Sequence, residues 1–205
     1  DNKIKFLKTH QALWRANNFS FTDEENTLGV IHIVRDPRNV ITSILNYFNR
    51  DDYMHALEFI SDPKRCIGLK SGNNSNDLMT IISSWGNHYN SWKKFKKNNL
   101  LIKYENLLIR PEEEFVKICN FIEKISNFKF EKKLILKAVQ SCDFNKLCEQ
   151  EKSGGFIEGT KNKTGTKKRF FDLGPKNNWQ KLLDKKISHK IEKIFEKEML
   201  DVGYL

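Results

Sequence analysis

Cysteine is scarce in this sequence, and its few cysteines form no recognisable framework. Only four occur among 205 residues. No Cys-x-x-Cys pair and no group of cysteine with histidine at zinc-finger spacing is present, so neither a disulfide scaffold nor a bound metal is predicted. We therefore expect free thiols and a reducing, cytoplasmic location. The four are Cys66, Cys119, Cys142 and Cys148.

Long hydrophobic runs are missing as well. No apolar stretch approaches the roughly 18 to 20 residues that cross a bilayer, and the opening DNKIKFLKTH does not resemble a signal peptide. We therefore expect no membrane partner. An apolar strand pattern is already under way by Ile4, so we expect that an N-terminal portion precedes Asp1.

Acidic residues are fewer than basic ones. The chain has 36 Lys and Arg against 26 Asp and Glu, a formal net charge of +10. Such an excess favours an anionic partner, which could be a nucleotide, a nucleic acid or an acidic surface. Many lysines stand on polar helix faces, as in 93–97 and 181–197, and no nucleic-acid-binding motif is present. A nucleic-acid partner is therefore not expected.

One stretch, Leu28 to Phe48, organises the rest of the chain. An apolar, β-branched run typical of a buried parallel strand leads through Arg35 and Asp36 to Pro37, after which apolar residues recur at helical spacing. In open α/β sheets ligands bind at the carboxyl ends of strands, where a helix N-terminus offers N–H groups to an anion. Arg35 is thus a candidate phosphate or sulfate ligand, the alternative being that it pairs with Asp36 or another carboxylate.

The remaining patterns alternate between strand and helix, which predicts an α/β fold with a mostly parallel sheet. Strands are expected at Ile4–Leu7 and Leu100–Tyr104, a long helix over 77–97, and a helix from Pro111, where three glutamates suit the macrodipole. No repeat or second domain is indicated, so residues 1–205 form one domain. Other helices are expected at 54–60 and 131–139, followed by a short helical turn that runs through Leu147 and by a last helix after Trp179.

Polar side chains follow the first predicted strand. Lys8 and His10 lie where a strand end would present them, which makes this a candidate active-site edge. The alternative is that His10 is an ordinary surface side chain. Tyr104 and Glu105 place polar groups at the end of the later strand in the same way.

Residues 150–170 are rich in Gly, Lys, Thr and Ser and have no periodic apolar pattern. This composition predicts a mobile basic loop, with a disordered surface excursion as the plain alternative. Before the loop, the order Ser-Cys-Asp-Phe at 141–144 indicates a helix cap.

Six segments, taken in order, resemble the cytosolic-type sulfotransferases, enzymes that use 3′-phosphoadenosine-5′-phosphosulfate (PAPS) and release 3′-phosphoadenosine-5′-phosphate (PAP). Their order and spacing extend the resemblance through nearly the whole chain. It implies a P-loop-NTPase-like three-layer fold, with a central, mostly parallel sheet flanked by helices. The segments are FLKTH (6–10), VIHIVRDPRNVITSILNYF (30–48), SSWGNHYNSW (83–92), LLIKYENLLIRPEEEFVKICNFI (100–122), SCDFNKL (141–147) and FFDLGPKNNWQKLL (170–183).

The resemblance assigns roles to particular residues. His10 matches the family's general base, and Lys8, two residues earlier on the same side, is expected to steady charge on the transferred group. Arg35 and Ser43 match the pair that holds the 3′-phosphate, a role that suits a guanidinium fork and a hydroxyl. Tyr104 matches a family tyrosine near the adenine.

Other matched positions depart from the family pattern. Cys142 and Phe144 stand in a stretch that is Thr-Ser-Phe in the family, so Phe144 is expected to pack on the base and Cys142 to keep at most a backbone contact. The family's Arg-Lys-Gly over the 3′-phosphate is replaced by Asp-Leu-Gly, whose Gly174 still offers its N–H. We expect three basic residues slightly upstream to supply the missing charge: Lys167, Lys168 and Arg169.

The largest departure is the lack of the family's Pro-Lys-Ser-Gly-type loop, which cradles the 5′-phosphosulfate. We expect the sequence to be a fragment of a longer enzyme, because the sheet would otherwise lack its first strand and leave apolar edges uncovered. The alternative is a chain that cannot turn over.

Three functional hypotheses follow. The first is a sulfotransferase that moves a sulfuryl group from PAPS to a hydroxyl or amine of a small molecule, with His10 as the base and no metal. The second is an inactive PAP- or PAPS-binding module, and the third is a basic nucleic-acid-binding protein. The sequence names no acceptor, and it leaves the oligomeric state open, with a homodimer among the options.

Overall fold

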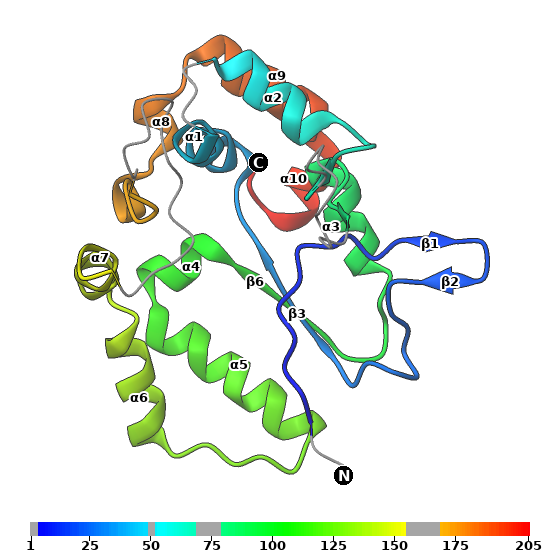
Figure 1. Ribbon diagram of the computed structural model, residues 1–205, viewed down its shortest axis with the longest axis vertical. Helices are drawn as coiled ribbons and strands as arrows, with labels where there is room; N and C mark the ends of the chain where they lie inside the picture. The colour runs from blue at the N-terminus through cyan, green and yellow to red at the C-terminus, as the bar shows by residue number, and fades with distance from the viewer. Residues whose placement is uncertain (1–3, 49–51, 69–78, 155–168) are drawn as a thin grey trace.

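A pair of parallel strands lies at the centre of the molecule in the computed structural model, which describes residues 4–48, 52–68, 79–154 and 169–205. Strands β3 (Val30–Val34) and β6 (Asn99–Lys103) run side by side in Figure 1. Val30 pairs with Asn99 and Val34 with Lys103, so both strands end at the same level. Parallel strands joined through helices are typical of α/β proteins, and the predicted fold class is confirmed.

Helices gather in two groups around this pair (Figure 1). One group lies beyond the carboxyl ends of the strands and beside them: α1 (Pro37–Phe48), α2 (Tyr53–Ser61), α3 (Trp85–Lys93), α8 (Trp179–Leu182), α9 (Lys185–Ile194) and α10 (Glu196–Val202). In the other group, α4 (Tyr104–Ile109) and α5 (Pro111–Ile125) pack against β6, and α6 (Lys132–Ser141) packs against α5. Helix α7 (Phe144–Lys152) follows α6, and a 3₁₀ turn, η1 (Gly174–Lys176), precedes α8.

The main core lies among the helices of the first group. Apolar residues at helical spacing on α1, α2 and α9 face one another, and Ile41, Ile191 and Met199 are fully buried. Removal of apolar surface from water is the main favourable term in folding, so this cluster fixes α1 in place. The cluster contains Ile41, Leu45, Ala56, Leu57, Ile60, Ile191, Phe195 and Met199.

The predicted strand at Ile4–Leu7 is wrong. This segment has no regular structure, and Leu7 is 88% exposed. A strand needs a neighbour that accepts its backbone hydrogen bonds, and none of the described strands pairs with this segment.

The long helix predicted over 77–97 is also wrong in its first part. Residues Thr80–Ile81 form a short strand, β5, which pairs antiparallel with β4 (Cys66–Ile67). Ser83 then has φ of +58°, and the Ser84 hydroxyl caps α3. The apolar residues keep their helical spacing across this break, so periodicity alone predicts one continuous helix. The two serines instead set the start of α3.

The segment after His10 and the end of the chain also differ from the prediction. Within the polar segment after His10, β1 (Arg15–Ala16) and β2 (Phe19–Ser20) form the hairpin at the edge of Figure 1, with Asn17 at φ of +53° in its turn. The sequence predicts a single last helix after Trp179, but the structure has three helices there, because α8, α9 and α10 each end before the next begins. Among the residues that the structure describes, no helix has the length and apolarity needed to span a bilayer.

Candidate functional site

Arg35 stands directly after β3, at the carboxyl end of the parallel pair. Its guanidinium carbon lies 4.5 Å from the centre of the Tyr104 ring. Tyr104 follows β6 as Arg35 follows β3, so the parallel register brings both residues to one edge. The structure therefore joins two of the residues predicted for a nucleotide site.

Asp36 pairs with Arg38 rather than with Arg35. The Arg38 Nη2 donates to Asp36 Oδ2 at 2.7 Å, and both side chains are almost completely buried. Arg38 also donates to Glu192 at 2.7 Å, and its guanidinium lies 3.9 Å from the centre of the Trp179 ring. Burial opposes the charge of Arg38, but hydrogen bonds to Asp36 and Glu192 raise its pKa. An Arg35–Asp36 ion pair, the alternative left open by the sequence, is ruled out.

Glu105, the other carboxylate close to Arg35, also has other partners. Its Oε1 accepts the N–H of Asp36 at 3.0 Å, and its Oε2 accepts the hydroxyl of Tyr204 at 2.8 Å. Within the described residues Arg35 forms no ion pair. The two carboxylates near Arg35, those of Asp36 and Glu105, therefore already have hydrogen-bonding partners other than Arg35.

The Nε atom of Arg35 is buried and has no hydrogen-bond partner among the described residues. Burial lowers the pKa of Arg35, and the nearby Tyr104 and acidic groups partly offset this effect. Arg65 also has a buried Nε without a partner, but its guanidinium pairs with Asp62 at 3.2 Å. Arg35 alone of the two combines an unpaired donor with an unpaired charge, which is the arrangement that an anion would complete.

The N-terminus of α1 is not open to an anion. The N–H of Arg38 donates to Asp36 Oδ1 at 2.9 Å, and the N–H of Asp36 donates to Glu105. Two carboxylates therefore already occupy the positive end of the helix. The expectation that backbone N–H groups would bind a ligand here is wrong, and the side chain of Arg35 is the donor that remains.

Helix α1 also holds the segment that follows Gly174. Thr42 Oγ1 donates to Asn177 Oδ1 at 2.5 Å, and Asn177 Nδ2 donates to the Asn39 carbonyl at 3.1 Å. Ser43, next to Thr42, is half-buried, and its hydroxyl makes no hydrogen bond within the described part of the chain. The element that carries Ser43 thus lies beside the segment of Gly174.

Gly174 and Phe144 are in direct contact. Gly174 has φ of +47°, and a Cβ added there would lie 2.2 Å from the Phe144 ring. Only glycine fits this close approach and this left-handed backbone. The Phe144 ring also meets Phe171 edge to face, with 6.4 Å between the ring centres. Two more of the predicted residues are therefore brought together from segments thirty positions apart.

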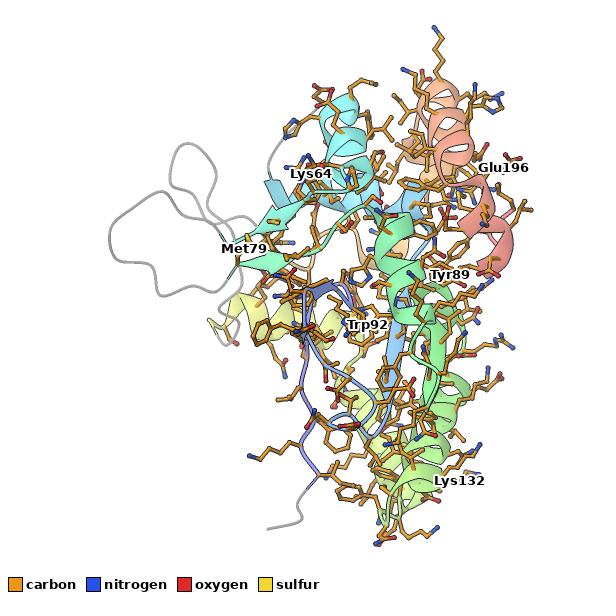
Figure 2. All side chains as sticks on the ribbon, turned by 90° about the vertical axis from the view of Figure 1, so that its right-hand side faces the viewer. Lys64, Met79, Tyr89, Trp92, Lys132 and Glu196 are labelled. Carbon is orange, nitrogen blue, oxygen red and sulfur yellow. The ribbon has the colours of Figure 1, made fainter. Side chains whose placement is uncertain are left out.

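His10 is exposed, and its neighbours are fixed on α3. Trp92 Nε1 donates to the Gln11 carbonyl at 2.9 Å, and Ser91 Oγ accepts the N–H of Leu13 at 2.9 Å. Figure 2 shows Trp92 where α3 approaches the N-terminal segment. Helix α3 therefore anchors the residues that follow His10, although the segment itself has no regular structure.

Three histidines follow one another from the surface inward. The His88 ring contacts the backbone of His10, and its centre lies 5.8 Å from that of His32. Burial lowers the pKa of His88, and burial together with the charge of His88 lowers the pKa of His32 to about 4. The two inner rings are thus neutral near pH 7. Lys8 is exposed on the same segment as His10.

A family model of the sulfotransferase domain matches residues 2–203. The chain belongs to the sulfotransferase family. Among curated proteins, Sulfotransferase 2A1 of Macaca fascicularis is 29% identical over 182 residues, which cover 84% of this chain and 57% of that protein. The resemblance predicted from the ordered segments is confirmed.

Solved sulfotransferase-fold structures resemble this chain in fold. Mouse sulfotransferase SULT7A1 complexed with PAP has a TM-score of 0.58 at 19% identity, covering 86% of this chain and 60% of that one. Retinol dehydratase in a complex with retinol and PAP has a TM-score of 0.54 at 16% identity, covering 83% and 47%. The chain thus spans about half to three fifths of the length of the relatives that it matches.

The other predicted residues of this sulfotransferase chain are less well joined to the site. Cys142 is exposed at the end of α6, where its N–H bonds to the carbonyls of Ala138 and Val139, so that N–H is already used. Arg169 is exposed and forms no ion pair within the described residues. Lys167 and Lys168 lie outside the described residues, as does most of the predicted loop at 150–170. Helix α7 continues to residue 152, so that loop begins later than predicted.

Several residues of the site were missed from the sequence. The order Asp-Pro-Arg at 36–38 is a signal for a helix cap that could have indicated the role of Asp36. Nothing local to Tyr204 predicts its contact with Glu105, because that contact joins residues 99 positions apart. Two hollows of about 440 and 320 Å³ lie along α3, and Arg35 lines neither. In the described residues, no group of three or more His, Cys, Asp or Glu is placed to hold a metal.

Proposed function

We propose that this chain binds the 3′-phosphoadenosine end of PAPS and takes part in sulfuryl transfer to a hydroxyl or amine of a small molecule. Arg35 carries the proposal. Its buried Nε has no hydrogen-bond partner among the described residues, and neither neighbouring carboxylate pairs with it. A guanidinium with open donors matches the oxygens of a phosphate better than any neutral ligand, because its fork is planar and permanently charged.

The other residues that would hold the nucleotide are suited to it chemically. Ser43 offers a hydroxyl without a partner in the described residues, and Tyr104 stacks under the Arg35 guanidinium. Phe144, packed on Gly174, offers an aromatic ring to a base. Both solved relatives named above contain PAP, which supports this choice of ligand.

His10 is proposed as the general base. Its imidazole is exposed to an incoming acceptor, and imidazole is the side chain that most often serves as a general base in proteins. Lys8 is proposed to steady negative charge beside it. PAPS, when bound, supplies the sulfuryl group, and His10 takes the proton from the acceptor hydroxyl or amine. A cytoplasmic location and a small-molecule acceptor remain predictions.

The test is transfer of labelled sulfate from PAPS to a panel of phenols, alcohols and amines. The unchanged protein is expected to transfer label, and Arg35→Ala to lose most of the transfer at limiting PAPS. Arg65→Ala is the matched control, since it removes an arginine whose Nε also lacks a partner. Equal transfer by all three proteins would contradict the proposal.

An inactive nucleotide-binding module is the second candidate. Calorimetric titration with PAP separates the two candidates. Binding of PAP that depends on Arg35, without transfer to any acceptor, would support the module.

A further inference from the structure

We infer that Tyr204 keeps Glu105 from pairing with Arg35 and thereby preserves the affinity of the site for a 3′-phosphate. The inference rests on the proposed function. Tyr204 is then a positioning residue, because it acts on the phosphate-binding arginine only through a carboxylate.

The two oxygens of Glu105 are both occupied. Oε2 accepts the Tyr204 hydroxyl at 2.8 Å, while Oε1 accepts the N–H of Asp36 at 3.0 Å and lies 3.4 Å from Asn39 Nδ2. The Tyr204 hydroxyl also lies 3.3 Å from the carbonyl of Val34, the last residue of β3. The side chain of Tyr204 thus fixes Glu105 against the strand end that carries Arg35.

Without the hydroxyl, the freed oxygen of Glu105 would be available to the guanidinium of Arg35, which lies close enough to interact with it through charge. Glu105 and Arg35 already interact through charge, although they form no ion pair. Carboxylate and guanidinium form short, two-point hydrogen bonds, and such a pair would use the donors that a phosphate needs. Arg38 restrains Asp36, the other nearby carboxylate, in the same way.

Tyr204 is itself firmly placed. Arg38 Nη2 donates to its carbonyl at 2.8 Å, and Lys103 Nζ donates to the Gly203 carbonyl at 3.0 Å. The Lys103 ammonium also lies 4.9 Å from the centre of the Tyr204 ring. Burial, with the charge of Glu105, raises the pKa of Tyr204, so its hydroxyl keeps the proton that it donates. These contacts hold the donor in one position.

The test is calorimetric titration of PAP and of adenosine 5′-phosphate into Tyr204→Phe. We expect PAP to bind about tenfold more weakly, because Glu105 then competes with the 3′-phosphate for Arg35, while adenosine 5′-phosphate is unaffected. Adding Glu105→Gln should restore PAP binding, because a neutral amide still accepts the N–H of Asp36 but does not neutralise Arg35. Tyr53→Phe is the control, since it removes an exposed hydroxyl that bonds the Leu182 carbonyl.

The Nε–H resonance of Arg35 in ¹⁵N NMR spectra gives a readout that needs no nucleotide. We expect it to shift in Tyr204→Phe and to return in the double variant. Unchanged PAP affinity in Tyr204→Phe, or equal losses for both nucleotides, would overturn the inference and leave the proposed function standing. If the unchanged protein binds no PAP, the proposed function is wrong and the claim about affinity falls with it, whatever the resonance does.

Discussion

Arg38, and not Arg35, is the ion-pair partner of Asp36, with 2.7 Å between Nη2 and Oδ2. Because both side chains are buried, the pair neutralises a carboxylate at the start of α1 that would otherwise face Arg35. The same pair connects α1 to Glu192 on α9 and to the carbonyl of Tyr204. Arg38 therefore supports the fold, and because it pairs with Asp36 it leaves the guanidinium of Arg35 available to an anion.

Arg38→Met is expected to destabilise the protein strongly. The change leaves Asp36 buried without its partner, which typically costs about 3–5 kcal/mol of unfolding free energy. Arg110→Met is the control, because Arg110 is half exposed and its pair with Glu113 should contribute less than about 1 kcal/mol, while buried Glu114, 4.0 Å from Arg110, keeps Lys117 as its closer partner. Urea denaturation measures both. Equal losses in the two variants would show that the buried pair has no special role.

Gly174→Ala should be more damaging than Gly154→Ala. Both glycines have positive φ, +47° and +82°, so alanine is strained by about 1–2 kcal/mol at either position. At Gly174 the new Cβ also meets the Phe144 ring, whereas at Gly154 it meets no atom within 4 Å. We expect lower stability for the first variant in thermal unfolding, together with weaker PAP binding. Similar behaviour of the two variants would contradict the contact.

His32 should make the protein less stable in acid. Its folded-state pKa of about 4 lies below the ordinary 6.5, so the unfolded chain takes up a proton first as the pH falls. Stability is therefore fully present above about pH 6.5 and is lost progressively down to about pH 4. In His32→Gln the loss over this range should shrink by up to about 3 kcal/mol. Urea denaturation at several pH values measures it.

The control for that series is His189→Gln, because the His189 side chain is 86% exposed. Its stability should fall with pH in parallel with that of the unchanged protein. Some acid sensitivity should remain in His32→Gln, since burial also lowers the pKa of His88. A pH dependence that is identical in all three proteins would show that His32 does not contribute.

His10→Gln should abolish transfer without weakening nucleotide binding. A general base typically contributes a factor of about 10² to 10⁴ in rate. His88 is the histidine next to His10, and because burial lowers its pKa it is a weak base that should not replace His10. Labelled-sulfate transfer and PAP titration, measured side by side, check this. The assignment of the base fails if transfer in His10→Gln stays near that of His189→Gln.

Elements with strong local signals could be predicted from the sequence. The β-branched run before Arg35 and the apolar spacing after Pro37 specify β3 and α1, and Pro111 with its three glutamates specifies the start of α5. By contrast, the strand predicted at Ile4–Leu7 is wrong because strand formation depends on a partner that the segment itself does not encode. Local patterns decide helices more reliably than they decide strand pairing.

The site was predicted in part for the same reason. Arg35, Tyr104, Phe144 and Gly174 were assigned through the family resemblance, and the structure brings them together as two contacting pairs. The groups that hold Asp36 and Glu105 were not foreseen. Tyr204 reaches the site only through the packing of α10, and no spacing rule connects residues so far apart in the sequence.

The ratio of PAP affinity to adenosine 5′-phosphate affinity tests the central claim most directly, because the two nucleotides differ only in the 3′-phosphate. Calorimetry on the unchanged protein should give at least about tenfold tighter binding of PAP, as expected for a charge-assisted contact to a half-buried arginine. In Arg35→Ala the ratio should fall close to one, while Arg65→Ala keeps it. A ratio that survives in Arg35→Ala would contradict the account.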